Sequence, residues 1–314
     1  MPRAYGVNAQ LLGLTATSYG AAPVGDYARL PFVSSDLGAE QALVATDVIG
    51  QGRDSAPQTR DLIKVSGNVV VPADLRNIGQ WLTWLLGAPT TTGAAAPYTH
   101  TWISGASSLP SFALEVGFTD VSKYFMELGL VLGSMAWDLK TSGNADVTCA
   151  IVGQSEVIAA ASGGGAPTEE VFTRFSQFQG MIQKDGVTLA AVTAAKATYD
   201  NKLESVQVIR SDGLVDGVDP TLAELTGEID VRFTDTTLMD AATAGTPMAL
   251  TFGYQIDASN SFQVTAHHVL LPKTKLGVTG PGGIQAKYQW QASKDPTLGK
   301  MATFVLTNDV AAYS

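Results

Sequence analysis

Histidine and cysteine, whose side chains often serve in acid–base, nucleophilic and metal chemistry, are scarce in this sequence. The histidines are His100, His267 and His268, and the one cysteine is Cys149. His267 and His268 are adjacent on an expected strand, so their side chains point to opposite faces and do not chelate one metal ion. Cys149 lies in an alternating apolar stretch, which predicts a buried and inert thiol.

Three further motifs lack the residues that their chemistry requires. Residues 216–220 form an acidic turn without the spacing or the distal Glu of a calcium loop. Residues 163–165 and 280–283 are glycine-rich but lack the Lys-Ser/Thr of a phosphate-binding loop. There is no Gly-x-Ser-x-Gly elbow, and a hydrolase with a dispersed site would need converging titratable groups. We therefore expect no enzyme activity, no catalytic residue, no metal site and no cofactor.

Composition favours a subunit of an assembly. The chain has 314 residues, of which 45% are hydrophobic and 15% are charged, well below the roughly 25% charged residues of an average soluble domain. A surface with so few charges suits a protein that is covered by copies of itself. The net charge of −10 disfavours sequence-specific DNA binding, because Lys and Arg supply most of that affinity.

Targeting signals are not apparent in the sequence. The N-terminal region lacks the apolar segment and cleavage site of a secretory signal, and no apolar run approaches the roughly 20 residues that span a bilayer. We expect no membrane association and folding in a cytoplasm.

Most of the chain is predicted to be strand. Apolar and polar residues alternate in many short stretches separated by Gly, Asn, Asp and Pro, which is typical of antiparallel sheets joined by hairpins. The predicted strands span residues 62–71, 111–118, 124–132, 134–141, 145–153, 203–210, 225–233, 248–256, 261–271, 283–292 and 301–307.

One helix is strongly indicated after residue 74. Asp74 is a suitable N-cap, apolar residues follow at helical spacing up to residue 86, and Gly87 is a suitable C′ residue. Trp81 lies at the edge of the apolar stripe and is expected in the core. Trp84 lies well off the stripe, so we interpret it as a subunit contact, with a core position as the alternative.

The sequence contains an internal repeat. Residues 65–71 resemble residues 225–231, with Gly67 and Gly227 aligned, and both are followed by a helical stretch, a Gly-x-Pro and four strands. The paired strands are 112–118 with 249–254, 124–132 with 262–270, 135–139 with 284–288, and 147–152 with 302–306. The second helical stretch is residues 237–244.

The two copies are separated by an Ala/Gly-rich stretch that is typical of a linker. Divided at Gly165, each half carries a net charge of −5. We predict a first domain over residues 1–160, a linker over residues 161–168 and a second domain over residues 169–314.

Several segments of the first half resemble the tail tube (major tail) proteins of long-tailed bacteriophages. They are residues 30–38, 49–54, 65–72, 81–89, 98–101, 114–117 and 123–125. The likeness covers about residues 5–155, and it reaches the second half only through the repeat. These are packing motifs rather than catalytic signatures.

The resemblance implies a mainly β fold with short helices, in which two tandem tail-tube-like β-sandwich domains contribute strands to a closed β-barrel shared between subunits. Such subunits form rings that stack into the tail tube, through which DNA passes without tight binding. The implied partners are further copies of the chain, the tape measure protein and the tail-end proteins. The implied location is the virion tail, assembled in the host cytoplasm.

Two predictions concern assembly. The repeat favours a ring of three chains with pseudo-sixfold symmetry over a ring of six. Residues 41–61 and 90–110, assisted by an N-terminal arm over residues 2–17, are expected to make contacts between rings or neighbours.

A further prediction concerns the channel wall. Alternation on the aligned strands predicts that Ser66, Asn68, Glu228 and Asp230 face the lumen, where carboxylates would repel DNA. The alternative is that these residues face the outside. The alternative function is another virion or surface β-structure, such as a decoration protein or a carbohydrate-binding adhesin.

Overall fold

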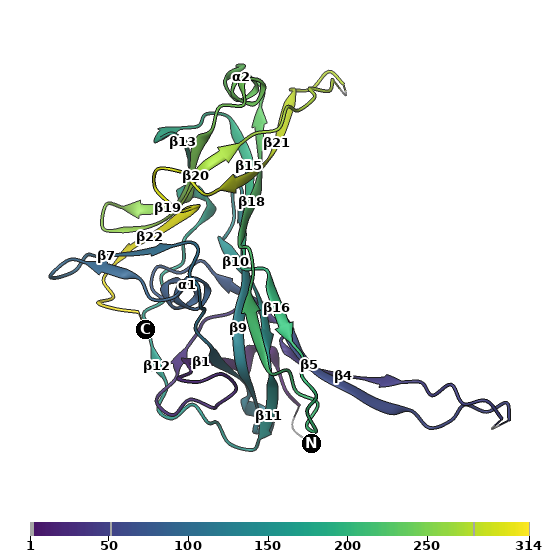
Figure 1. The fold of residues 1–314 in the computed structure, drawn as a ribbon. Helices are drawn as coiled ribbons and strands as arrows, with labels where there is room; N and C mark the ends of the chain where they lie inside the picture. The colour runs from purple at the N-terminus through teal and green to yellow at the C-terminus, as the bar shows by residue number, and fades with distance from the viewer. Residues whose placement is uncertain (1–2, 51, 279, 314) are drawn as a thin grey trace.

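The computed structural model describes residues 3–50, 52–278 and 280–313, and its architecture is mainly β (Figure 1). Its largest layer, here called the central sheet, is antiparallel throughout. In spatial order it contains β3 (Ser34–Ser35) and β4 (Gly38–Val44), β5 (Thr59–Pro72), β10 (Asp146–Gly153), the end of β9 (Lys123–Leu139), β15 (Val192–Asp200), β18 (Glu224–Arg232), β21 (Gln285–Ser293) and the end of β20 (Asn260–Leu270).

Two outer sheets accompany the central sheet. The first contains the beginning of β9 with β1 (Ala9–Thr15), β2 (Ala28–Arg29), β8 (Phe112–Phe118), β11 (Ser155–Ala159) and β12 (Thr168–Glu169). The second contains the beginning of β20 with β6 (Thr90–Thr92), β7 (Tyr98–Ile103), β13 (Gly180–Lys184), β14 (Val187–Thr188), β19 (Met248–Asp257) and β22 (Ala302–Asn308). A separate hairpin joins β16 (Leu203–Val206) and β17 (Gly217–Pro220). Thus β9 and β20 each pass from an outer sheet into the central sheet.

The helices lie close to their predicted positions. Helix α1 is Ile78–Leu86, later than expected, because the Asp74 carboxylate accepts the backbone N–H of Asn77 at 2.7 Å and caps a preceding turn. Gly87 has φ 91° and ends the helix. Helix α2 is Thr237–Ala244, as predicted. Three short 3₁₀ segments complete the assigned helices of the described residues: η1 (Gly6–Asn8), η2 (Thr119–Val121) and η3 (Gln177–Gln179).

One hydrophobic core extends across both halves of the chain. Trp137, from the end of β9, has its ring centroid 5.9 to 6.3 Å from those of Phe252, Phe262 and Phe304 in the second half. Aromatic pairs at such separations contribute about 0.5–1.5 kcal/mol each beyond the area that they bury. The two halves therefore fold against each other as one packed unit.

Trp84 belongs to this core, and its predicted role as a subunit contact is wrong. Its side chain is fully buried, its ring is stacked on Phe112 with centroids 4.2 Å apart, and its indole N–H donates to Thr15 Oγ1 at 2.9 Å. Strands β1 and β8 cover the side of α1 that lies off the apolar stripe. Trp81 is buried as expected.

The same succession of strand pairings occurs twice along the chain. In the first half, β5 pairs with β10, β10 with β9, β9 with β8 and β11, β8 with β1, and β1 with β2. In the second half, β18 pairs with β21, β21 with β20, β20 with β19 and β22, β19 with β13, and β13 with β14. Helix α1 follows β5 as α2 follows β18.

This pairing changes two of the strand correspondences expected from the sequence. By its neighbours, β21 corresponds to β10, and β22 corresponds to β11. The expected matches of residues 135–139 with 284–288 and of 147–152 with 302–306 are therefore displaced. The alignment of Gly67 with Gly227 is kept, because both glycines lie where a neighbouring strand approaches: a Cβ on Gly67 would be 2.5 Å from Leu37 Cα, and one on Gly227 would be 2.5 Å from Trp290 Cζ2.

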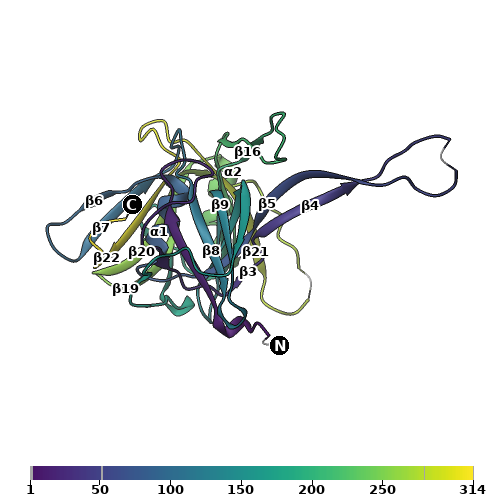
Figure 2. The same ribbon diagram turned by 90° about the horizontal axis from the view of Figure 1, so that it is seen from below.

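The segments expected to act as loops have different structures. Residues 9–15 are not an arm but strand β1, paired along its length with β8. Strands β4 and β5 form a long hairpin, here called the arm, that extends far from the body (Figures 1 and 2). Near its tip, Val48 and Ile49 are exposed. Strands β6 and β7 form a second hairpin, which adds to the second outer sheet through β22.

The expected linker is held against the first half. The Glu115 carboxylate accepts the Ser162 hydroxyl and the Gly163 N–H, both at 2.6 Å. The backbone of Tyr27 bonds to both Gly164 and Thr168. This connection is therefore a fixed part of the fold.

A buried carboxyl gives this fold a pH dependence that can be measured. Glu127 on β9 is 1% exposed and lies opposite Glu156 on β11, and burial, with the Glu156 carboxylate, raises its pKa to about 9. The folded chain keeps this proton up to about pH 9, whereas the unfolded chain releases it near 4.5. At Glu127 the folded chain thus binds more protons between these values, so the contribution of this group to stability falls as pH rises.

Between pH 5 and pH 9 we expect the slope of melting temperature against pH to be more negative in the unmodified chain than in Glu127→Gln. The amide resembles the protonated carboxyl but does not ionise. Thermal melts of both proteins across this pH range test the expectation, and equal slopes would contradict it.

Candidate functional site: the polar face of the central sheet

The central sheet has one buried face and one polar face, as side-chain alternation along a strand requires. Along β21 the alternation is complete, and the buried side chains are Ala286, Tyr288, Trp290 and Ala292. The residues between them, including Lys287, Gln289 and Gln291, are exposed. Strands β5, β10 and β18 alternate in the same way. The face opposite the core is therefore lined by Thr, Ser, Asn, Gln and charged residues.

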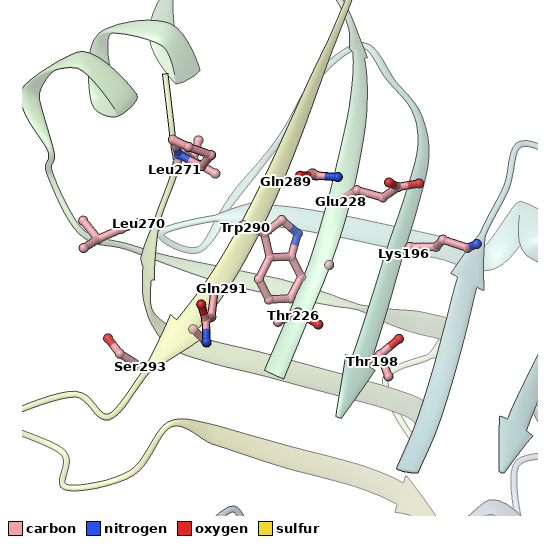
Figure 3. Close-up of a pocket in the computed structure, with 13 residues that line it drawn as sticks. Lys196, Thr198, Thr226, Glu228, Leu270, Leu271, Gln289, Trp290, Gln291 and Ser293 are labelled. Atoms are coloured by element: carbon pink, nitrogen blue, oxygen red, sulfur yellow. The ribbon is translucent and has the colours of Figure 1, made fainter. Parts of the chain in front are cut away.

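Strand register arranges this polar face in rows. One row of directly opposed residues crosses six strands and consists of Thr148, Ala136, Thr198, Thr226, Gln291 and Leu270. A second row consists of Asp138, Lys196, Glu228 and Gln289. Figure 3 shows Lys196, Glu228 and Gln289 side by side on three neighbouring strands. The polar face is continuous across the junction of the two halves.

The polar face is hollowed where β15, β18 and β21 meet the end of β20. The depression has a volume of about 930 Å³ (Figure 3). Among the described residues that line it, the titratable ones are Lys196 and Glu228. Lys196 Nζ lies 3.7 Å from Asp138, and Glu228 bonds to Lys287. Both charges are thus engaged in ion pairs.

The four residues predicted to face the lumen lie on this polar face. Ser66 and Asn68 are exposed on β5, and Glu228 and Asp230 are half-buried on β18. Asn68 opposes Ala150 in a row that runs through β10, β9 and β15 to Glu224 on β18, so both pairs share one side of the sheet. Four strand spacings separate β5 from β18, about 19 Å.

The carboxylates of this face are balanced by lysines. Glu228 Oε2 lies 2.7 Å from Lys287 Nζ, and this hydrogen bond raises the pKa of Lys287. Asp230 lies directly opposite the same lysine. Lys202 bridges Asp200 at 3.1 Å and Glu224 at 3.0 Å. The face is therefore mixed in charge, and the repulsion of DNA by Glu228 and Asp230 stays a prediction.

The histidines, the cysteine and the acidic turn that were considered for chemistry each have contacts within the fold. His267 Nε2 contacts Thr303 Oγ1 at 2.6 Å, and His268 Nδ1 contacts Ser293 Oγ at 2.7 Å, so the adjacent rings have separate partners. Burial raises the pKa of the Cys149 thiol and lowers that of His100, whose ring nitrogens contact Thr91 and Val310. Asp216 accepts from Arg210 at 2.9 Å.

Within residues 3–50, 52–278 and 280–313, no group of three or more His, Cys, Asp or Glu side chains is arranged to hold a metal ion. In the same ranges, no helix has both the length and the hydropathy needed to cross a membrane.

Strand β15 was not predicted from the sequence, so Lys196 and Thr198 were not expected on this face. Ala195, Ala197 and Tyr199 alternate with Lys196 and Thr198, which is a strand pattern. Two of the inward residues are alanines, which have low strand propensity, so the signal was weak. Strand β21 lies within a predicted strand, residues 283–292, but its polar side chains were not among those predicted to face the channel.

Comparison with known proteins identifies the family. No curated protein matches the chain. A family match, however, covers nearly the whole length, including both halves and the strands of the polar face. Residues 6–292 match the family described as phage tail tube protein, so the chain belongs to this family and is a structural protein of the phage tail.

Proposed function

We propose that three copies of the chain form a ring, and that rings stack into a tube whose channel carries DNA out of the virion. The observation that carries this proposal is the central sheet, in which the same set of strands occurs twice in one continuous layer with one polar face. Each half would act as one tail-tube-like domain, so three chains would supply six domains with pseudo-sixfold symmetry.

The free edges of the central sheet favour a barrel that is closed between subunits. An open sheet edge is prone to aggregation, and joining sheets end to end across a ring removes such edges. Within one chain the central sheet has two ends, one at β3 and β4 and one where the end of β20 pairs with the last residues of β21. Three such sheets in a circle would make one barrel shared by all subunits.

The polar face would line the channel, with Ser66, Asn68, Glu228 and Asp230 among its residues. DNA affinity depends mainly on Lys and Arg that are free to neutralise phosphates. On this face Lys196, Lys202 and Lys287 are each paired with carboxylates. Two further cations at the same alternation, Lys64 on β5 and Arg232 on β18, are exposed and have no ion pair among the described residues. The rest of the wall would offer DNA hydroxyls, amides and paired lysines, so DNA could move past it without tight binding.

The arm would join one ring to the next. It extends well beyond the body of the chain (Figure 2) and carries exposed apolar side chains near its tip, which a neighbouring ring could cover. The further partners of the tube would be the tape measure protein and the tail-end proteins, and the tube would be assembled in the host cytoplasm. The family match does not favour a decoration protein or an adhesin, and a structural family indicates a protein that is not an enzyme.

Electron microscopy of the purified, assembled chain tests the ring. We expect rings or tubes with three chains per ring, and six similar domains around the channel. Native mass spectrometry of single rings gives an independent count. Six complete chains in each ring would contradict the proposal.

Removing carboxylates from the wall should slow DNA passage. We expect phage carrying Glu228→Gln and Asp230→Asn to assemble normal tubes but to eject DNA more slowly, because Lys287 loses its partner. Ejection should recover toward the normal rate as salt shortens the screening length from about 10 Å at 0.1 M to about 3 Å at 1 M. Adding Lys287→Gln is the matched control and should restore the rate. Unchanged ejection at low salt would argue against a lumenal position.

Shortening the arm should separate ring formation from stacking. Thr46 Oγ1 donates to the Pro57 carbonyl at 2.8 Å at the base of the tip, so deletion of residues 47–56 leaves two ends already in contact. We expect this variant to form rings that do not elongate into tubes, as judged by negative-stain microscopy. Tubes of normal length would exclude a stacking role for the arm.

A further inference from the structure

The junction between the two halves indicates how neighbouring chains join. At this junction the end of β9 pairs with β15, from Ser134 opposite Asp200 to Leu139 opposite Ala195. If each half is one copy of a repeated domain, the second copy of one chain should meet the first copy of the next through equivalent strands. This reasoning rests on the ring proposed above.

The strand equivalent to β15 in the first half is the segment 34–40. Gly227 pairs with Ala197 on β15, and the aligned Gly67 lies against Leu37. Leu37 therefore corresponds to Ala197. Three residues further along each strand, Glu40 corresponds to Asp200. The side of β15 that faces β9 is paired from Ala195 to Asp200, whereas β3 and β4 pair only with β5 among the strands of the described residues. The segment 34–40 therefore has no strand on its other side, where the Leu37 N–H donates to Ser35 Oγ at 3.3 Å and the Ala39 N–H donates to Glu156 Oε2 at 3.4 Å.

The strand equivalent to the end of β9 is the segment that follows β20. Leu132 opposes Ile151 on β10, and Ile151 corresponds to Trp290 on β21. Because Leu270 opposes Gln291, the residue that reaches Trp290 is Leu271, which is buried like Leu132. Residues 272–278 then correspond to residues 133–139, the part of β9 that pairs with β15.

Residues 272–278 have the pattern of a strand but lack its partner. Within the described part of the chain they belong to no strand and form no backbone hydrogen bond. Thr274 and Leu276 are half-buried, whereas Lys273 and Lys275 are exposed, which is the alternation of a strand with one face on the core. Pro272 takes the place of Gly133, where β9 has a bulge, and bulges tolerate proline.

Charge complements this geometry. By the equivalence, Lys273 replaces Ser134, and Ser134 opposes Asp200 at the junction within the chain. Lys273 of one chain would therefore oppose Glu40 of the next. Glu40 is exposed and has no ion pair among the described residues. Opposite charges directly across two strands stabilise the pairing.

We propose that residues 273–278 become a strand on assembly, inserted between β21 of their own chain and residues 34–40 of the neighbouring chain, with Lys273 paired to the neighbour's Glu40. This strand addition would join the sheets of neighbouring chains, as the pairing of β9 with β15 joins the two halves of one chain. Repeated around the ring, it would close the barrel. A free chain would keep the segment unpaired, so the edge would form only when a second copy supplies its partner.

Cysteine cross-linking tests this contact in the full chain. Cys149 is buried, so Lys273→Cys combined with Glu40→Cys provides the reactive thiols. Directly opposed residues on paired strands lie within disulfide range. We expect oxidation of assembled protein to give covalent dimers and trimers on a non-reducing gel, with no larger closed species. The matched control, Glu40→Cys with Thr226→Cys, keeps both thiols on the polar face but away from the junction and should not cross-link.

Charge exchange provides a second test that does not depend on oxidation. Lys273→Glu or Glu40→Lys alone should reduce ring formation, because like charges would face each other, and the two changes together should restore it. Rings that form without cross-linking above the control, or without rescue in the exchanged pair, would overturn this contact and leave the ring itself standing. Failure of the unmodified chain to form rings would overturn both.

Discussion

The pairing of β9 with β15 is the interaction on which the rest of this structure depends. It joins two similar strand sets into one sheet, and it gives that sheet a single polar face and a single buried one. Behind it, Trp137 packs among phenylalanines from the other half, so separation of the strands would also open the core. Alternation of side chains alone would give the sheet of each half one polar face. The pairing of β9 with β15 places the polar faces of the two halves on the same side of one sheet.

The balance of charge on the polar face follows from the same ladder. A net charge of −10 suggests that exposed carboxylates dominate everywhere, yet strand register brings lysines opposite them. Lys196 opposes Glu228, and Lys287 opposes Asp230, because neighbouring strands present those residues at the same level. The acidic surplus of the whole chain therefore says little about the local field at any one surface.

Local signals in the sequence predicted local structure well. The strongly alternating strands, helix α2 and the paired glycines 67 and 227 were found because their patterns are complete within a few residues. The failures involve contacts between distant segments. Strand β15 is rich in alanine and is defined by the strands on either side of it, and Trp84 is buried by β1 and β8, which no helical stripe reveals. The matching of β21 with β10 required the pairing itself, because short apolar strands resemble one another in sequence.

Among the described elements no strand lies between α2 and β19, where a counterpart of the β6–β7 hairpin would be, although that hairpin extends the outer sheet of the second half through β22. In the proposed ring, such an addition would occur three times around the circumference, whereas the strands of the wall would occur six times. The inside of the tube would then be nearly uniform to a passing helix of DNA, while its outside would repeat only every third of a turn. Duplication within one chain would thus let the two surfaces have different symmetries, so that a feature added to the exterior need not disturb the bore.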